Sequence, residues 1–144
     1  MITKASIYEH RLDNKHELPS NLDSLERVEQ IIESLRERFE IPENVYVNIL
    51  VAISEAIMNA IKHGNKFDCS KRVKLSFKVT KSEYVFVIQD EGAGFDYKNV
   101  PDPTHPDNKE KPDGRGIFII NALADRVKYV NKGREIKIYF KRAY

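Results

Sequence analysis

Residues 49–65 read ILVAISEAIMNAIKHGN, and this stretch decides the fold. From its first residue to Ile61 it is almost wholly apolar, with only Ser54, Glu55 and Asn59 as exceptions. The apolar residues recur with the 3.6-residue period of a helix buried in a core. The sequence therefore predicts a central helix against which the other elements pack.

Three polar residues of this helix, Glu55, Asn59 and His63, are spaced four apart. Residues at this spacing share one side of an α-helix, so the sequence predicts a single polar stripe. A carboxylate in so apolar a helix is costly unless a polar or ionic group meets it. The stripe is either a narrow solvated surface or a functional site, and the rest of the chain bears on that choice.

The composition indicates a soluble globular protein, with 41% hydrophobic and 32% charged residues among 144. This length fits one domain, which we expect to span residues 1–144. The net charge of +2 is too small to indicate nucleic-acid binding. Cys69 is the only cysteine, which excludes an internal disulfide and a thiolate metal cluster. We see no signal peptide and no apolar run long enough to span a bilayer, so we expect a cytoplasmic protein without membrane contact.

Two elements are expected before the central helix. A loose alternation within residues 2–12 predicts a short edge strand. Ser20 or Asn21 can cap a helix that runs to about Phe39, with Leu22 on its apolar face. Pro42 suits the first turn of the central helix.

The second half of the chain alternates strands with one loop and one helix. Strands are predicted by alternating or apolar runs, and a helix by the apolar run that follows the second glycine pair. The expected elements are strands 73–79 and 84–90 joined by a short hairpin, a loop over 96–113, a helix from Ile117, and strands 127–130 and 135–140. Helices would then cover one face of a mostly antiparallel sheet, which is an α+β two-layer sandwich.

Two glycine pairs, Gly92 with Gly94 and Gly114 with Gly116, bracket the loop at residues 96–113, which holds four of the six prolines. A long loop without secondary structure in a compact domain is usually a functional lid or a disordered segment. A glycine pair before a helix lets backbone N–H groups approach a phosphate. The chain has no GK[ST] tripeptide and so no Walker-type loop, and the second pair does not follow an apolar strand as in a Rossmann site.

These motifs together resemble a known family. Glu55-xxx-Asn59, Asp90-x-Gly92-x-Gly94 and Gly114-x-Gly116 look like the three boxes of the GHKL ATPases, which share the Bergerat fold. The run NAIKHGN at residues 59–65 resembles the branch of anti-sigma factors that are serine kinases. The resemblance covers nearly the whole chain and implies ATP and Mg²⁺ as ligands.

The resemblance implies a role for each of three polar residues. Asn59 would give an oxygen to Mg²⁺, which prefers hard oxygen ligands. Glu55 would be the general base, unless it only forms an ion pair with Lys62, Lys66 or another basic residue. Asp90 would accept a hydrogen bond from the adenine amino group, unless it only begins a turn.

The glycine boxes would surround the nucleotide. Gly92 and Gly94 would let the chain pass close to the base and the lid, while Gly114, Arg115 and Gly116 would contact phosphates. Either Lys62 or His63 would face the phosphates, and His63 is the better candidate because it lies on the Glu55 stripe. Relatives often carry threonine or serine after the glycine of the last hairpin, whereas Arg134 and Glu135 follow Gly133 here.

The resemblance implies a serine/threonine kinase that uses Mg-ATP to phosphorylate a small anti-sigma antagonist protein. It also implies a sigma factor as competing partner, and a homodimer. Two alternatives stay open. One is a module that binds nucleotide without phosphotransfer, and the other is a detached histidine-kinase-type ATPase domain, although the chain shows no upstream helical pair bearing a phosphorylatable histidine.

Overall fold

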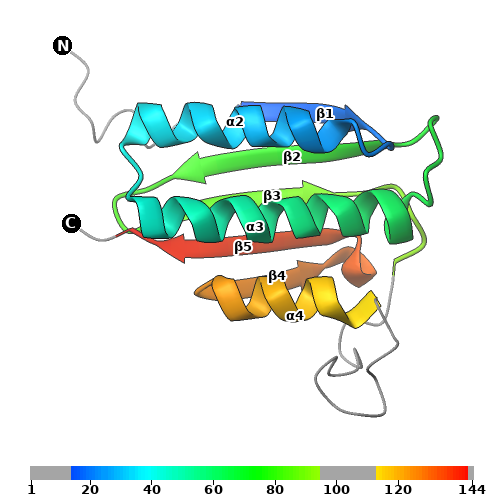
Figure 1. Ribbon diagram of the computed structural model, residues 1–144. Coiled ribbons are helices and arrows are strands. Elements are labelled where there is room, and N and C mark those ends of the chain that lie inside the picture. The colour runs from blue at the N-terminus through cyan, green and yellow to red at the C-terminus, as the bar shows by residue number, and fades with distance from the viewer. Residues whose placement is uncertain (1–13, 95–112, 143–144) are drawn as a thin grey trace.

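A computed structural model describes residues 14–94 and 113–142 of the chain. Helices α2, α3 and α4 cover one face of a five-stranded sheet (Figure 1). In chain order the described elements are β1 (Asn14–Pro19), α2 (Ser24–Phe39), α3 (Glu43–Asn59), the π-helix η2 (Ala60–Gly64), β2 (Arg72–Val79), β3 (Glu83–Gln89), α4 (Asp113–Leu123), β4 (Arg126–Val130), the 3₁₀ turn η5 (Asn131–Gly133) and β5 (Glu135–Lys141). The predicted α+β two-layer architecture is confirmed.

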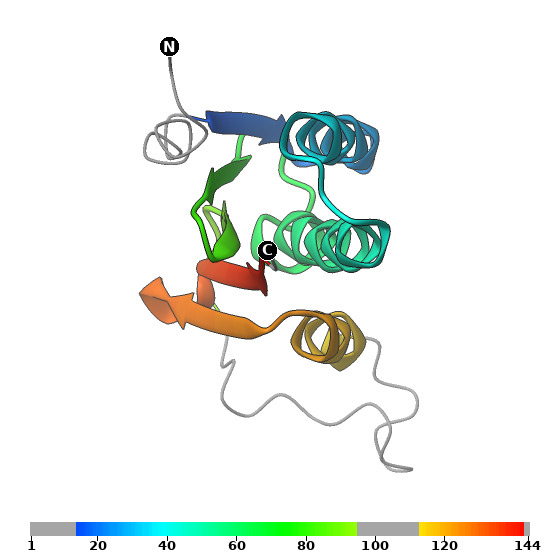
Figure 2. The same cartoon turned by 90° about the vertical axis from the view of Figure 1, so that its left-hand side faces the viewer.

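The sheet has the strand order β1-β2-β3-β5-β4, and every neighbouring pair is antiparallel. Seen along the layers, the sheet lies to the left and the three helices to the right (Figure 2). Alternation along each strand directs one set of side chains to the helices. The buried members of that set are Val73, Leu75, Phe77, Val79, Tyr84, Phe86, Ile88, Ile136, Ile138 and Phe140.

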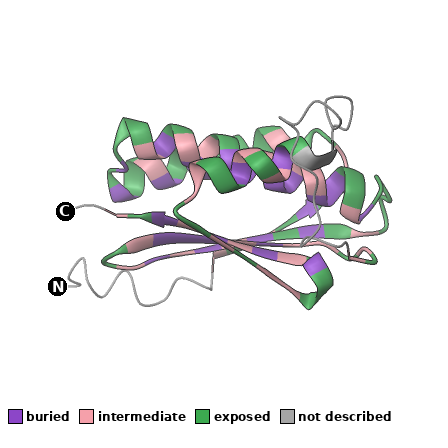
Figure 3. Cartoon of the chain, turned by 90° about the horizontal axis from the view of Figure 1, so that it is seen from below, coloured by how far each residue is buried: buried purple, intermediate pink, exposed green. Residues whose placement is uncertain are grey.

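Helix α3 supplies the centre of the core. Ile49, Ile53 and Ile57 are fully buried and recur every four residues along the sheet-facing side. Burial follows the interface between the helical layer and the sheet, while the outer sides of the helices are exposed (Figure 3). The core residues of α2, Val28, Ile32 and Leu35 among them, pack in the same cluster.

By length and composition, the helical stretch Glu43–Gly64 could cross a membrane, so the expectation that no apolar run is long enough was wrong. This is weak evidence, because the core helix of a soluble protein passes the same test. The buried isoleucines of α3 pack against the sheet and against α2. The helix therefore has the packing of a core helix.

Several predicted boundaries were wrong. The strand expected at residues 2–12 lies entirely within residues 1–13, outside the described part, and stays a prediction; the first strand among the described residues is Asn14–Pro19. Helix α2 begins at Ser24 with Asp23 at its N-cap, so neither Ser20 nor Asn21 caps it, and Leu22 is 50% exposed rather than on the apolar face. The expected lid at residues 96–113 lies, except for Asp113, outside the described residues.

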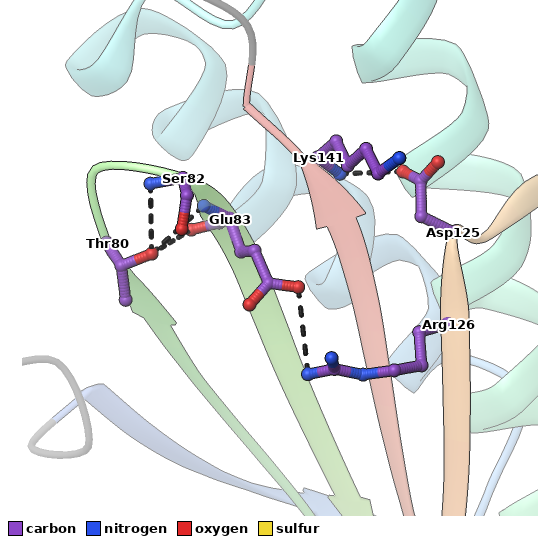
Figure 4. A network of polar contacts seen from close by, with 6 residues as sticks. All are labelled: Thr80, Ser82, Glu83, Asp125, Arg126 and Lys141. Carbon is purple, nitrogen blue, oxygen red and sulfur yellow. Dashed lines mark hydrogen bonds and ion pairs between the residues drawn. The ribbon is translucent and has the colours of Figure 1, made fainter.

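Polar contacts link the strands at the β2–β3 turn, which is the end of the sheet opposite Asp90 (Figure 4). Thr80 Oγ1 accepts hydrogen bonds from the backbone N–H groups of Ser82 and Glu83 in the β2–β3 turn. The Glu83 carboxylate lies 3.7 Å from the Arg126 guanidinium. The predicted short hairpin is confirmed, and this cluster links β3 to β4 across β5.

Candidate functional site

The predicted site residues of the described part gather where the central helix ends. Helix α3 changes from α- to π-helical at Ala60, and the π-turn closes at Gly64. The Asn65 N–H donates to the Ala60 carbonyl oxygen, five residues back, at 2.8 Å. Single π-turns within α-helices are often found at functional sites. The antiparallel register brings the end of β3 and the start of β5 to the same end of the sheet.

The π-turn changes the expected polar stripe. Glu55 and Asn59 remain one α-helical turn apart, and both are half-buried. His63 lies inside the π-turn and is exposed, as is Lys62. The choice between His63 and Lys62 as the residue that faces the phosphates therefore stays a prediction.

Glu55 and Asn59 meet the start of α4. A Cβ atom added to Gly116 would lie 2.8 Å from Asn59 Nδ2, 3.0 Å from Asn59 Oδ1 and 3.1 Å from Glu55 Oε2. The backbone of α4 thus covers the polar ends of both side chains closely, and only a glycine leaves them their present positions. Neither Lys62 nor Lys66 forms an ion pair with Glu55 among the described residues.

Helix α4 begins earlier than predicted. Gly114, Arg115 and Gly116 belong to its first turn instead of preceding it. Arg115 is exposed, and Gly116 is buried. The first N–H groups of a helix have no partner within it, and the helix dipole is positive there, so this turn could bind an anion.

Asp90 lies against the π-turn. A Cβ atom on Gly64 would fall 2.4 Å from the Asp90 carboxyl carbon, and one on Gly92 would fall 2.1 Å from the Gly64 carbonyl oxygen. The Gly92 N–H donates to Asp90 Oδ1 at 2.8 Å, so Asp90 does form the local turn that was its alternative interpretation. The second carboxylate oxygen leaves capacity for a ligand as well.

The carboxyl group of Asp90 is half-buried, and its burial raises its pKa above the usual value. The Gly92 N–H and the positive charges of Arg134 and Lys71 act in the opposite direction. A carboxyl group with a pKa raised by desolvation, held in a constrained turn, is typical of functional sites, although structural groups also show it.

The remaining glycine of this box packs against the last hairpin. Gly94 has φ of +88°, and a Cβ atom there would lie 2.3 Å from the Lys132 carbonyl oxygen. The close approaches of Gly92 and Gly94 are thus to the backbone of this chain. Arg134, the residue that departs from the family pattern, accepts a hydrogen bond from the Asp90 N–H through its carbonyl oxygen at 2.9 Å.

The polar side chains of this region suit Mg²⁺ bound together with a nucleotide better than a metal ion held by protein ligands alone. The described residues contain no group of three or more His, Cys, Asp or Glu side chains that could hold a metal ion. Magnesium usually keeps several waters and takes one or two protein oxygens together with phosphates. The Asn59 amide oxygen beside the Glu55 carboxylate, under the side-chain-free backbone of Gly116, fits that requirement.

Sequence reasoning missed two residues of this region. Gly64 and Asn65 close the run NAIKHGN and suit the end of a helix, but no site role was predicted for them; Gly64 is in contact with Asp90, and Asn65 is almost fully buried. In the sequence, the only signal is a glycine followed by a polar residue directly after an apolar helix. The partners of Asn65 lie far away in the sequence, so their identity required the fold.

The chain is similar to a known family and to known proteins. The family model of the histidine kinase-like ATPase domain matches residues 18–140. The serine-protein kinase RsbW of Oceanobacillus iheyensis is 33% identical over 91 residues, which cover 59% of this chain and 58% of that protein. The serine-protein kinases RsbW of Staphylococcus aureus strains JH9 and Newman are 31% identical over 84 residues, covering 54% of this chain and 53% of each. The chain spans little more than half the length of these curated relatives.

Proposed function

Because this chain belongs to the family of histidine kinase-like ATPase domains, we propose that it is an ATP-binding serine/threonine kinase of the anti-sigma-factor type. One observation carries the proposal. At the start of α4, Gly116 packs directly over the side chains of Glu55 and Asn59. A carboxylate and an amide therefore lie side by side beneath a helix N-terminus. That combination offers a proton acceptor, a magnesium ligand and an anion site in one place.

The nucleotide would be held at the end of the sheet. Asp90 would accept a hydrogen bond from the adenine amino group, and Gly92 and Gly94 would shape the chain around the base. Gly114, Arg115 and Gly116 would bind phosphate oxygens, and either His63 or Lys62 would add a positive charge. Asn59 would bind Mg²⁺ through its amide oxygen.

Bound Mg-ATP would supply the phosphoryl group, with ADP as the leaving product. Glu55 would orient the serine or threonine hydroxyl of the partner and accept its proton as the new oxygen–phosphorus bond forms. Phosphoryl transfer depends chiefly on positioning and on neutralising charge, so the contribution of the protein is mostly geometric. The apolar residues around Glu55 on α3 would limit access of competing water.

The names of the relatives support the choice of a serine residue as acceptor. By family resemblance, the acceptor protein would be a small anti-sigma antagonist, and a sigma factor would compete for the same chain. We extend the proposal to residues 1–144 acting as one ATP-binding domain, to a homodimer and to a cytoplasmic location without membrane or direct nucleic-acid contact.

The test is phosphotransfer by wild type and by Glu55→Gln, which keeps shape but removes the charge. With a partner captured in the presence of Mg-ATP, we expect Glu55→Gln to bind Mg-ATP nearly normally and to lose phosphotransfer by about two orders of magnitude or more. Radiolabelled ATP and mass spectrometry measure the rate and locate the phosphoryl group. Glu43→Gln, at the other end of the same helix, is the matched control and should retain the wild-type rate.

Three results would contradict the proposal in different ways. Wild type that binds Mg-ATP but transfers nothing to any captured partner would favour the binding module. Phosphate on histidine instead of serine or threonine would favour the histidine-kinase type. Wild-type transfer by Glu55→Gln would leave the kinase intact but show that Glu55 is not its base.

A further inference from the structure

Asn65 is almost completely buried, with 1% of its surface exposed. It follows the π-turn directly, and its own N–H closes that turn on the Ala60 carbonyl oxygen. A primary amide buried in this way is costly unless its donors and its acceptor are satisfied. Its partners therefore show what the residue does.

The Asn65 side chain makes three hydrogen bonds, each to a different segment. Nδ2 donates to Ser20 Oγ and to the Arg72 carbonyl oxygen, both at 3.0 Å. Oδ1 accepts from the Glu91 N–H at 2.7 Å. The amide thus uses both donors and its acceptor, and it joins the end of the central helix to the loop before α2, to the start of β2 and to the turn after β3.

The bond to Glu91 bears directly on Asp90. On one side, the Asp90 N–H is fixed by the Arg134 carbonyl oxygen at 2.9 Å. On the other side, Asn65 fixes the next residue of the chain, and the Glu91 carboxylate in turn accepts from the Arg72 N–H. Asp90 therefore lies between two backbone anchors, one from the last hairpin and one from Asn65.

The same bond holds Asp90 against the π-turn. Gly64 immediately precedes Asn65, and the space where its side chain would be is filled by the Asp90 carboxyl group. Without the Asn65 bond, the Glu91 backbone would lose its direct hydrogen bond to the residue after Gly64, and the turn at residues 90–92 would be held less tightly against the π-turn. The position of the carboxylate depends on a contact that does not involve the carboxylate itself.

We propose that Asn65 is a positioning residue that holds the Asp90 carboxylate in the orientation that selects adenine. It acts through Asp90 and does not touch the nucleotide. This inference rests on the proposed function, in which Asp90 reads the base. Loss of the Asn65 amide should therefore weaken ATP binding and reduce the preference for ATP over GTP.

The experiment compares Asn65→Ala with Ser20→Ala. Both variants disrupt the buried network and should lower the melting temperature. Ser20→Ala leaves the Asn65–Glu91 bond intact, so it should keep the wild-type dissociation constants for Mg-ATP and Mg-GTP. Asn65→Ala should bind Mg-ATP about tenfold or more weakly, with little change for Mg-GTP, as measured by calorimetry. Asn65→Asp keeps the acceptor for Glu91 and should retain most of the selectivity.

A second measurement needs no nucleotide. The titration of the Asp90 carboxyl group, followed by NMR, should shift in Asn65→Ala and stay at its wild-type midpoint in Ser20→Ala. If Asn65→Ala does not fold, Asn65→Ser takes its place in both measurements, because its hydroxyl is too short to make all three bonds.

The outcomes separate the two claims. Wild type that binds GTP as well as ATP would overturn the role of Asp90, and with it the selectivity role of Asn65. Wild-type selectivity and titration in Asn65→Ala would overturn only the role of Asn65. Equal loss of selectivity in Ser20→Ala and Asn65→Ala would show a general loss of stability and would also overturn it.

Discussion

The Asp90 carboxyl group is held where its charged form is disfavoured. Burial raises its pKa, so the folded protein binds this proton more tightly than the unfolded chain does. The resulting stabilisation is complete below the unfolded pKa of 3.8 and is lost as the pH rises through the higher folded value. At neutral pH the fold therefore bears a cost for an ionised Asp90.

Asp90→Asn should remove that cost and weaken ligand binding at the same time. An amide oxygen still accepts from the Gly92 N–H, so we expect higher stability than wild type at pH 7 and nearly equal stability at pH 3. Its affinity for Mg-ATP should fall by about tenfold or more, because the amide is a weaker acceptor for the adenine amino group. Urea unfolding at the two pH values and calorimetry measure both effects.

Asp68→Asn is the control with the opposite sign. Hydrogen bonds from Ser70 lower the pKa of Asp68, so its stabilisation is present above 3.8 and is lost as the pH falls. This variant should be less stable than wild type at pH 7 and should bind Mg-ATP normally. Unchanged ATP affinity in Asp90→Asn would remove Asp90 from the site.

Local sequence predicted which residues of the site are polar but not what they touch. Glu55, Asn59 and Asp90 were identified by their place on an apolar helix or at a strand end. Asn65 could not be interpreted in this way, because its partners Ser20 and Glu91 are 45 and 26 residues away. Contacts of that kind depend on tertiary packing, which no local pattern encodes.

At the level of elements, the first turn of α4 contains Gly116, although glycine disfavours helix formation. An alanine at residue 116 would favour the helix by about 1 kcal/mol. Its Cβ atom would displace the end of the Asn59 side chain, which lies 2.8 Å away, and press on Glu55. We expect Gly116→Ala to keep or raise stability and to lower phosphotransfer by about tenfold or more, since misplacement of reacting groups is costly.

Asn121→Ala is the matched control on the same helix. Its exposed side chain bonds only the Ile117 carbonyl oxygen within α4 among the contacts described, so its loss leaves Glu55 and Asn59 untouched. Thermal unfolding and the phosphotransfer assay should separate the two variants. A wild-type rate in Gly116→Ala would mean that the start of α4 tolerates a side chain over the pair.

Elements with strong periodicity were predicted well, and elements made by pairing were not. Strands β2 and β5 alternate clearly, and α3 is long and apolar. The sequence NKHELP of β1 has no such signal, because only Leu18 is buried and the strand depends on its backbone pairing with β2. The π-turn was also missed, because residues 60–64 have the composition of an ordinary helix end.

For the molecule as a whole, the ionisation of Tyr129 makes the stability of the fold depend on pH in the alkaline range. Burial raises the pKa of its hydroxyl from 10 to about 12. The folded protein therefore keeps this proton at a pH where the unfolded chain loses it, and stability should fall as the pH rises from 10 to 12. With allowance for partial exposure, the loss should be about 1–2 kcal/mol.

Tyr129→Phe should show a smaller fall in stability over this pH range, as measured by urea unfolding at pH 9, 10.5 and 11.5. Tyr139→Phe, on the neighbouring strand β5, is the control and should follow wild type. If the free energy of unfolding falls as steeply with pH in Tyr129→Phe as in wild type, groups other than Tyr129 cause the loss of stability at alkaline pH.

The strand order has a consequence for the time at which the protein becomes competent during its synthesis. The central strand β3 has β5 as its second neighbour, although α4, β4 and the intervening chain separate them in sequence. Until residues 134–141 emerge from the ribosome, one edge of β3 is open and the Asp90 N–H lacks its acceptor on Arg134. On the function proposed above, a nascent chain that already carries Glu55, Asn59 and Asp90 would lack a complete site, and ATP binding would begin only after synthesis of β5.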